Sequence, residues 1–439
     1  MALLSSSNFS EYLPDSYSLF SLPSYTTTTE MFYFNDVRPL SQINDSSPLE
    51  FAIPNQGSEY IDLKRTRLHV KLKVVHDDVT SSPLAEDEKS GAYQLVLQSL
   101  FSQVSVSLGN QLVSSANNHY PYKSMFKTLL NYGADAKSSQ LTSQLFYKDT
   151  GNDNDDIEST DAVAGGNDGL LKRGDYIAKS QEITMVGNLF EDVFNMDRYL
   201  INGVKLNVTL YRTDPQFCLM SGVANTKYKI SILDASLKVC YLKVNPALIL
   251  AHNTLFEEKT NGKPNNALYP YVKTEVKSTT IPVSTESFTI ENISNPVAHR
   301  YTVAFVESSS MTGSLVKNPY NFQLSMIKKV TLNVNGVSLP GRSSSADDAD
   351  TYLNLFDGVN VKRESKGNFI SRKEFLLGSA LFVFELNETG TEHLSLVRRG
   401  NVSLEIQFNA ALTKSLSCIV MTERTSLIEI DQARNVYVK

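Results

Sequence analysis

Apolar and polar residues alternate along many short stretches of this chain, and this period of two constrains its fold more than any other feature. Residues 68–74 read Leu-His-Val-Lys-Leu-Lys-Val, so one face of an extended strand would meet a core and the other would meet solvent. The same alternation recurs in residues 104–108, 204–210, 237–241, 330–334 and 402–408. Asn-Gly pairs at 202–203 and 335–336 are typical of tight turns, because both residue types tolerate a positive φ. Together these signals predict a mainly β protein built from antiparallel sheets in sandwiches.

Two stretches show the helical period instead. Apolar residues from Tyr122 to Leu130 recur at spacings of three and four, and Gly133 follows as a helix end. Residues 352–359 repeat that spacing after acidic residues between 347 and 350, which suit the positive end of a helix dipole. We therefore expect a few short helices in the loops, each with one face packed on a core.

These elements occur twice in the same order. The strand at 104–108 matches that at 330–334 at an offset of 226, and the helix from Tyr122 matches that from Tyr352 at an offset of 230. The strand at 204–210 matches that at 402–408 at an offset of 198. A repeated strand, turn, helix and strand predicts a tandem duplication, with two antiparallel β-sandwiches side by side. The offset falls by 32, so the first copy carries extra residues, and the acidic stretch Gly151–Gly169 lies there.

The chain accordingly divides into four parts. Residues 1–35 are rich in Ser, Thr and Tyr and form an arm, which we expect to be partly mobile in the free protein. Residues 36–252 form the first sandwich, with an acidic loop at 150–175 that we expect to be solvated and to decorate its outer surface. Residues 253–266 are a polar, turn-forming connector, and residues 267–439 form the second sandwich.

Composition narrows the class of protein. With 41% hydrophobic and 20% charged residues among 439, the chain is too apolar to be disordered and too polar to be embedded in a membrane. The longest apolar run, around Ala247–Ala251, is far short of the ~18–20 residues of a transmembrane helix, and we expect no signal peptide. A net charge of −6 argues against a strongly basic nucleic-acid site. Three cysteines without a Cys-x-x-Cys motif fit buried thiols in a reduced intracellular protein: Cys218, Cys240 and Cys418.

The chain shows no constellation of catalytic residues. Phosphate-binding loops, dinucleotide fingerprints, nucleophile elbows and zinc-protease motifs are all missing from the sequence. The six histidines are scattered, and a calcium loop starting at Asp153 fails because Ile157 stands at the fifth position and Glu158 at the sixth. Residues 343–345, Ser-Ser-Ser, indicate a loop rather than a nucleophile. We therefore predict no enzyme, and no catalytic, cofactor-binding or metal-binding residues.

A set of short segments, spread over nearly the whole chain, matches one known family. The segments are Ser18–Pro23, Glu59–Leu63, Ser99–Val104, Tyr120–Ser124, Leu129–Gly133, Gln140–Leu145, Tyr147–Asp149, Asp197–Gly203, Phe217–Met220, Ile232–Ser236, Lys317–Phe322, Val397–Asn401, Ile428–Asp431 and Asn435–Val436. Each segment is short, but their number and order make the match specific. In these segments the chain resembles the major capsid protein, or hexon, of Polinton/Maverick elements and the related adintoviruses.

This resemblance implies a tandem double jelly roll. Such proteins form homotrimers, which are pseudo-hexagonal capsomers that tile an icosahedral shell around double-stranded DNA. The implied partners are neighbouring capsomers, penton and minor capsid proteins, and the implied location is the virion, after synthesis as a soluble intracellular protein. We further expect the arm to become ordered beneath neighbouring capsomers on assembly.

Two other interpretations remain open at this point. A jelly-roll glycan-binding or attachment protein would also be β-rich and without catalytic residues, although such sites commonly use Trp and this chain has none. A domesticated capsid copy would keep the fold with a changed role.

Overall fold

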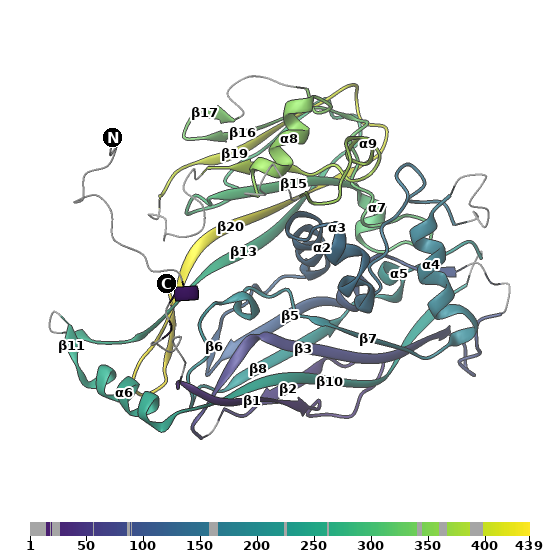
Figure 1. Ribbon diagram of the computed structural model, residues 1–439. Coiled ribbons are helices and arrows are strands. Elements are labelled where there is room, and N and C mark those ends of the chain that lie inside the picture. The colour runs from purple at the N-terminus through teal and green to yellow at the C-terminus, as the bar shows by residue number, and fades with distance from the viewer. Residues whose placement is uncertain are drawn as a thin grey trace.

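The computed structural model describes residues 15–17, 19, 27–55, 57–85, 88, 90–157, 166–223, 226–260, 263–339, 345–359, 367–386 and 398–439. Strands predominate in these ranges, and every pairing between the named strands is antiparallel. Two sandwiches lie one above the other in Figure 1, with the N-terminal half of the chain below and the C-terminal half above.

The lower sandwich, the first roll, consists of two four-stranded sheets, with orders β1-β10-β3-β7 and β2-β8-β5-β6. Its long strands β3 and β10 pair along most of their length, and register shifts in β10 mark bulges where the sheet bends. The strands are β1 (Thr29–Val37), β2 (Leu49–Ile53), β3 (Glu59–His76), β5 (Phe101–Leu108), β6 (Gln111–Leu112), β7 (Ile183–Asn188), β8 (Leu206–Arg212) and β10 (Tyr228–Val244).

The upper sandwich, the second roll, repeats that order, with sheets β13-β20-β15-β18 and β14-β19-β16-β17. Counted within each roll, the eight strands occupy the same places, so the duplication inferred from the sequence is a repeat of one jelly-roll topology. The strands are β13 (Ala267–Ile281), β14 (Ser287–Ile290), β15 (Arg300–Glu307), β16 (Ile327–Val334), β17 (Val337–Leu339), β18 (Phe382–Glu385), β19 (Val402–Phe408) and β20 (Leu416–Ile430), with β21 (Val436–Val438) added beside β20.

The predicted repeat pairs are confirmed element by element. The stretches at 104–108 and 330–334 lie in β5 and β16, and those at 204–210 and 402–408 lie mostly in β8 and β19. The β16–β17 turn has positive φ at Asn335 (52°) and Gly336 (83°), as a two-residue hairpin turn requires. The expected mainly β fold, two antiparallel sandwiches with short helices in the loops, is therefore confirmed.

Both predicted helices form, in the same connection of each roll. Helix α2 (Tyr120–Asn131) follows β6, and helix α8 (Ala349–Asp357) follows β17. Their environments differ: α2 is buried from Tyr120 to Leu130, whereas only Leu355 of α8 is fully buried. The remaining short elements are α1 (Val96–Ser99), α3 (Ala134–Ser138), α4 (Asp168–Ile177), α5 (Pro215–Cys218), α6 (Pro246–Glu257), α7 (Ser308–Met311), α9 (Arg372–Leu376), η2 (Asp15–Tyr17), η3 (Gln140–Gln144), η4 (Ala178–Ser180), η5 (Asp192–Asn195), and the pairs β4 (Ser90–Ala92) with β9 (Leu219–Ser221) and β11 (Lys259–Thr260) with β12 (Lys263–Pro264).

The two rolls share their hydrophobic cores. The first core includes Tyr269, Tyr271, Ile428 and Ile430 from β13 and β20, whose 15 residues each reach from the second roll down onto the first (Figure 1). The second core in turn takes up side chains of α2, a helix of the first roll. Because each roll completes the core of the other, the pair is packed as one unit.

Two elements extend into segments that the sequence suggested were irregular. Strand β1 begins at Thr29, within the arm of residues 1–35, because Tyr33 stacks on Tyr241 (ring centroids 5.6 Å apart) and donates a hydrogen bond to Glu59 (2.7 Å). Helix α6 runs to Glu257, within the connector of residues 253–266, because Asn245 caps its first turn and Phe256 is buried. The division into arm, first roll, connector and second roll remains a prediction.

Candidate assembly surfaces

Helix α2 lies in the seam between the rolls and fills it with aromatic side chains. Tyr122 makes edge contacts with Phe217 and with Tyr320 of the second roll, each at a centroid distance of 5.9 Å. One turn further on, Phe126 packs on Phe322 at 5.4 Å. Aromatic pairs in this geometry stabilise a contact beyond the effect of the apolar area that they bury, so these rings stabilise the packing of one roll on the other.

The next residues of α2 carry buried charges. Lys123 Nζ lies 2.8 Å from Glu191 and 3.1 Å from Asp192 of η5, and Lys127 Nζ lies 2.5 Å from Asp192. Asp192 also accepts a hydrogen bond from the backbone N–H of Thr274 in β13 (2.8 Å). This network therefore joins three elements from the two rolls.

The protonation states in this network follow from its geometry. Burial alone would raise the pKa of Asp192, but Lys123 and Lys127 outweigh it and lower that pKa. Burial likewise opposes the charge on Lys123, yet Asp192 and Glu191 raise its pKa. For Glu191 burial prevails and raises the pKa. Removing one member of this network would leave a buried charge without a partner, so the network depends on all of its members.

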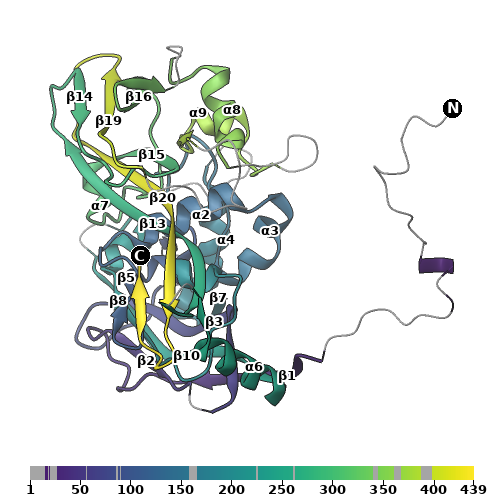
Figure 2. The same cartoon turned by 90° about the vertical axis from the view of Figure 1, so that its left-hand side faces the viewer.

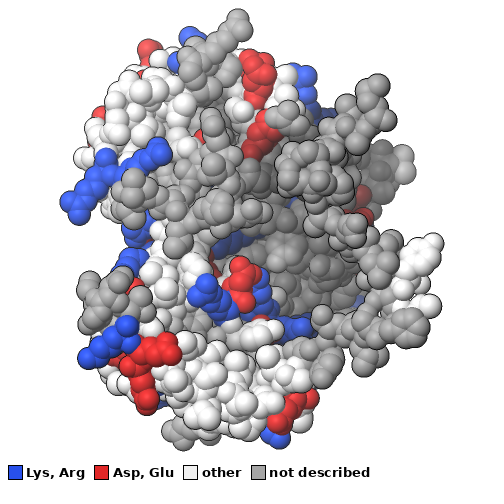
Figure 3. All heavy atoms as spheres, turned by 60° about the vertical axis from the view of Figure 1, so that its left-hand side comes forward, with Lys and Arg blue, Asp and Glu red and all other residues white. Residues whose placement is uncertain are grey.

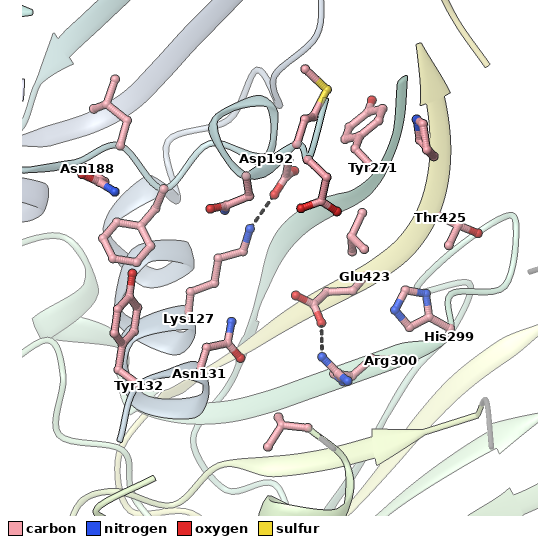
Figure 4. Close-up of a pocket in the computed structure, with 18 residues that line it drawn as sticks. Lys127, Asn131, Tyr132, Asn188, Asp192, Tyr271, His299, Arg300, Glu423 and Thr425 are labelled. Atoms are coloured by element: carbon pink, nitrogen blue, oxygen red, sulfur yellow. Dashed lines mark hydrogen bonds and ion pairs between the residues drawn. The ribbon is translucent and has the colours of Figure 1, made fainter. Parts of the chain in front are cut away.

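A cleft of about 850 Å³ opens beside this network, between the rolls. Lys127 points to Asp192 on one side of it, and on the other Arg300 of β15 pairs with Glu423 of β20 at 2.8 Å (Figure 4). Arg300 also lies 2.9 Å from Glu385 of β18. These charged groups are engaged with one another, so ion pairs occupy both sides of the cleft.

Lys137 of α3 is a buried lysine bound by carbonyl groups. Its Nζ donates to the backbone oxygen of Leu129 at 2.8 Å and to that of Asn368 in the second roll. Burial, and then the nearby charge of Lys148, lower its pKa to about 7. Lys148 in turn pairs with Glu374 of α9 at 2.8 Å, which adds a further link across the seam.

The acidic loop serves the same seam, so the expectation of a solvated outer loop is wrong for its described part. Asp155 accepts hydrogen bonds from Asn318 N (2.7 Å) and Asn321 Nδ2 (3.1 Å), and the neighbouring Asp149 accepts one from Asn318 Nδ2 (2.8 Å). Asp149 also pairs with the fully buried Arg173 of α4. The sequence carries no local signal for the contacts with Asn318 and Asn321, because these residues lie more than 160 positions from Asp149 and Asp155. Residues 158–165 of the loop lie outside the described residues.

Strand β1 presents an apolar patch to solvent. Met31, Phe32 and Phe34 are 51%, 54% and 41% exposed on this edge strand, and the Arg65 guanidinium lies over the Phe32 ring at 5.1 Å. The rings of Phe32 and Phe34 meet edge-on at a centroid distance of 6.4 Å. Exposed apolar side chains on an edge strand are typical of a surface that another chain covers. We call Met31, Phe32 and Phe34 the β1 patch.

Acidic and basic side chains are mixed on one face of the molecule (Figure 3). On the face shown in Figure 3, acidic and basic side chains alternate in small groups, and a hollow separates the two rolls. Many surface pairs lie close together, such as Arg38 with Asp234 at 3.3 Å. This pattern is unlike the basic stripe of a nucleic-acid-binding face.

The groups examined for chemistry in the sequence are dispersed in the structure. Cys218, Cys240 and Cys418 are all free and buried, as expected for structural thiols. Within the described ranges, no three His, Cys, Asp or Glu side chains are grouped as metal ligands. In the same part of the chain, no helix is long and apolar enough to cross a membrane.

The paired rolls are the double jelly roll of viral major capsid proteins. The chain superposes on a chain of the cryo-EM structure of the Sputnik virophage with a TM-score of 0.65 and 11% identity, covering 98% of this chain and 93% of that one. For the mavirus major capsid protein the TM-score is 0.56, with 13% identity and coverage of 98% and 95%. For the Faustovirus major capsid protein it is 0.53, with 9% identity and coverage of 94% and 93%. At these identities the matches show the fold.

Comparison by sequence adds one relative. The chain is 23% identical over 410 residues to the uncharacterized protein F54H12.2 of Caenorhabditis elegans, which covers 88% of this chain and 92% of the worm protein. No protein-family model matches the chain.

Proposed function

We propose that this chain is a major capsid protein of the Polinton/Maverick and adintovirus kind, a structural protein of the virion and not an enzyme. The observation that carries the proposal is the pair of eight-stranded rolls with one strand order, packed as one unit, in the fold of viral major capsid proteins. Three such chains would give six rolls, a pseudo-hexagonal capsomer that tiles an icosahedral shell around double-stranded DNA.

The surface supports this role. The β1 patch and an exposed apolar face of α6 are available for contacts between copies, which bury mainly apolar area when the assembly is permanent. The mixed surface charge suits polar, salt-sensitive contacts with neighbouring capsomers, penton proteins and minor capsid proteins. Enclosing DNA in such a shell requires no strongly basic site.

The test is the mass of the purified full chain by light scattering, followed by electron microscopy of the same peak. A homotrimer has a mass of about 146 kDa, three times 48.8 kDa, and a pseudo-hexagonal outline. A stable monomer across micromolar concentrations would contradict the proposal.

A second candidate is a domesticated capsid copy, which the occurrence of a relative in an animal favours. Such a protein would keep the fold and its capsomer but not the shell. Trimers that never form closed particles, even when co-expressed with the penton protein of the same element, would support it. A glycan-binding role has no comparable observation in its favour.

A further inference from the structure

Helix α6 forms one wall of an apolar groove of about 560 Å³ at the base of the molecule. Leu255 of α6, Tyr199 and Leu268 line the groove and are 51%, 47% and 44% exposed. Leu248 and Phe256 form its floor, packed against the first core. An opening of this size with several half-exposed apolar side chains is unusual on a surface that stays in water.

The buried or half-buried polar groups of Tyr60, His252 and Tyr269 have hydrogen-bond partners within the groove. Tyr60 Oη and His252 Nδ1 lie 2.6 Å apart, and Tyr269 Oη donates to the carbonyl of Tyr199 while accepting from the N–H of Ile201, each at 3.1 Å. The groove therefore offers mainly apolar surface, which favours an apolar peptide segment over a polar ligand.

The N-terminal segment of the chain begins at this groove. Asn245, the cap of α6, donates from its backbone N–H to the Thr28 carbonyl (2.9 Å) and from Nδ2 to the Thr27 carbonyl (3.3 Å). Thr28 and Thr29 line the groove, and β1 and α6 lie side by side in Figure 2. The chain thus passes the groove immediately after residue 26.

Residues 1–26 have the composition of such an occupant. They include no Lys or Arg and carry apolar side chains at short intervals: Leu3, Leu4, Phe9, Leu13, Leu19, Phe20 and Leu22. In this chain Tyr17 and Leu19 are 72% and 79% exposed, and η2 lies apart from both rolls (Figure 2). Tyr17 and Leu19 therefore lie outside the groove of their own chain, with their side chains in solvent.

We infer that the α6 groove binds the N-terminal segment, residues 1–26, of a neighbouring copy. Exchange of an identical segment between copies is a low-cost route to association, because each copy supplies both the segment and the groove. The inference rests on the self-association in the proposed function, and it adds the contact that links one copy to the next.

A photo-crosslinking residue tests it in the full chain. p-Benzoylphenylalanine replaces Leu255, which lines the groove, or, as the matched control, Leu250, which is 68% exposed on the same helix but is not among the lining residues. We expect irradiation of the Leu255 form to give a band at twice the chain mass on a denaturing gel, about 98 kDa, with residues 1–26 as the attached peptide. The Leu250 form should give several-fold less of this product.

Three outcomes would overturn the inference. The first is a trimeric sample in which the cross-linker at position 255 attaches to residues 1–26 but no band at twice the chain mass forms. This result would show that the groove binds the N-terminal segment of its own chain. Another is equal yield of the doubled band from the Leu250 form. The third is a sample that light scattering shows to be monomeric, and this result would also overturn the proposed function. A trimer that gives no cross-link between the groove and residues 1–26 would overturn the inference alone. A second test compares the self-association of the Leu255→Glu and Leu250→Glu variants. Only Leu255→Glu should weaken self-association, because only Leu255 lines the groove.

Discussion

At the scale of single residues, charges buried in the seam govern how stability depends on sequence and pH. Removing one member of a buried pair leaves its partner charged and without compensation, whereas an exposed pair has water as a substitute. Substitution of a charged residue in the seam should therefore lower the free energy of unfolding much more than substitution of a charged residue on the surface.

Asp192→Asn tests this difference. It removes the charge that faces both Lys123 and Lys127, and we expect the free energy of unfolding to fall by about 3–5 kcal/mol. The control is Asp197→Asn, since Asp197 is 90% exposed where it pairs with Lys64, and its effect should stay below about 1 kcal/mol. Denaturant unfolding measures both, and equal effects would contradict the assignment.

The buried amine of Lys137 should make the free energy of unfolding depend on pH. Its pKa is about 7 in the folded chain against an ordinary 10.5, so between these values the unfolded chain binds more protons. Stability from this residue should therefore rise with pH from about 7 to 10.5, with a slope of at most about 1.4 kcal/mol per unit.

Lys137→Met should remove that contribution. The measurement is the free energy of unfolding at pH 7 and pH 9.5 at one protein concentration, for the parent chain, for Lys137→Met and for the exposed control Lys172→Met. A slope in Lys137→Met that matches the parent would refute the prediction.

At the scale of elements, the same type of strand or helix has different tasks in the two rolls. Helices α2 and α8 occupy equivalent connections, yet α2 is buried in the seam and α8 lies near the surface of the second roll. Strand β1 likewise differs from β13, its counterpart in the second roll, because β13 reaches onto the first core and β1 leaves aromatic rings in solvent.

The β1 patch gives a prediction about association. Phe32→Ser with Phe34→Ser should weaken self-association by about 10- to 100-fold, because each ring contributes part of the 1.5–3 kcal/mol of a buried phenylalanine. Val79→Ser, at a fully exposed turn, is the control. Sedimentation across a concentration series measures the effect. Unchanged association in the double variant would exclude the patch from the contacts between copies.

At the scale of the whole molecule, the shared cores make the two rolls interdependent. If β13 and β20 came away from the first roll, or α2 from the second, apolar side chains of both rolls would be exposed. A rigid pair of rolls would also suit the proposed pseudo-hexagonal capsomer, since hinge motion between the rolls would change its outline.

We therefore expect one cooperative unfolding transition for both rolls. Calorimetry should give equal calorimetric and van't Hoff enthalpies per cooperative unit, at a fixed protein concentration. Asp192→Asn should shift that single transition to lower temperature. Two separate transitions, one of them insensitive to Asp192→Asn, would show that the rolls fold independently.

Many of the strands, the Asn-Gly turns and the duplication could be predicted from the residues alone. Apolar and polar residues that alternate with a period of two indicate which face of a strand is buried. A pattern of elements that occurs twice in the same order indicates that one topology occurs twice. The buried thiols and the helices α2 and α8 followed from the same kind of local signal. Strand β1 and helix α6 were missed in part, because aromatic runs and polar caps are ambiguous without knowledge of the neighbouring strand.

The contacts across the seam could not be predicted, because they depend on how the chain folds in three dimensions. Lys123 and Glu191 are 68 positions apart, and Asn318 and Asp155 are 163 apart. A local pattern states that a residue is buried or charged but does not name its partner. The acidic loop is the clearest case, since its composition favours solvent and Asn318 and Asn321 nevertheless bind it to the second roll. The groove beside α6 arises in the same way, from elements that the chain brings together only when both rolls are packed.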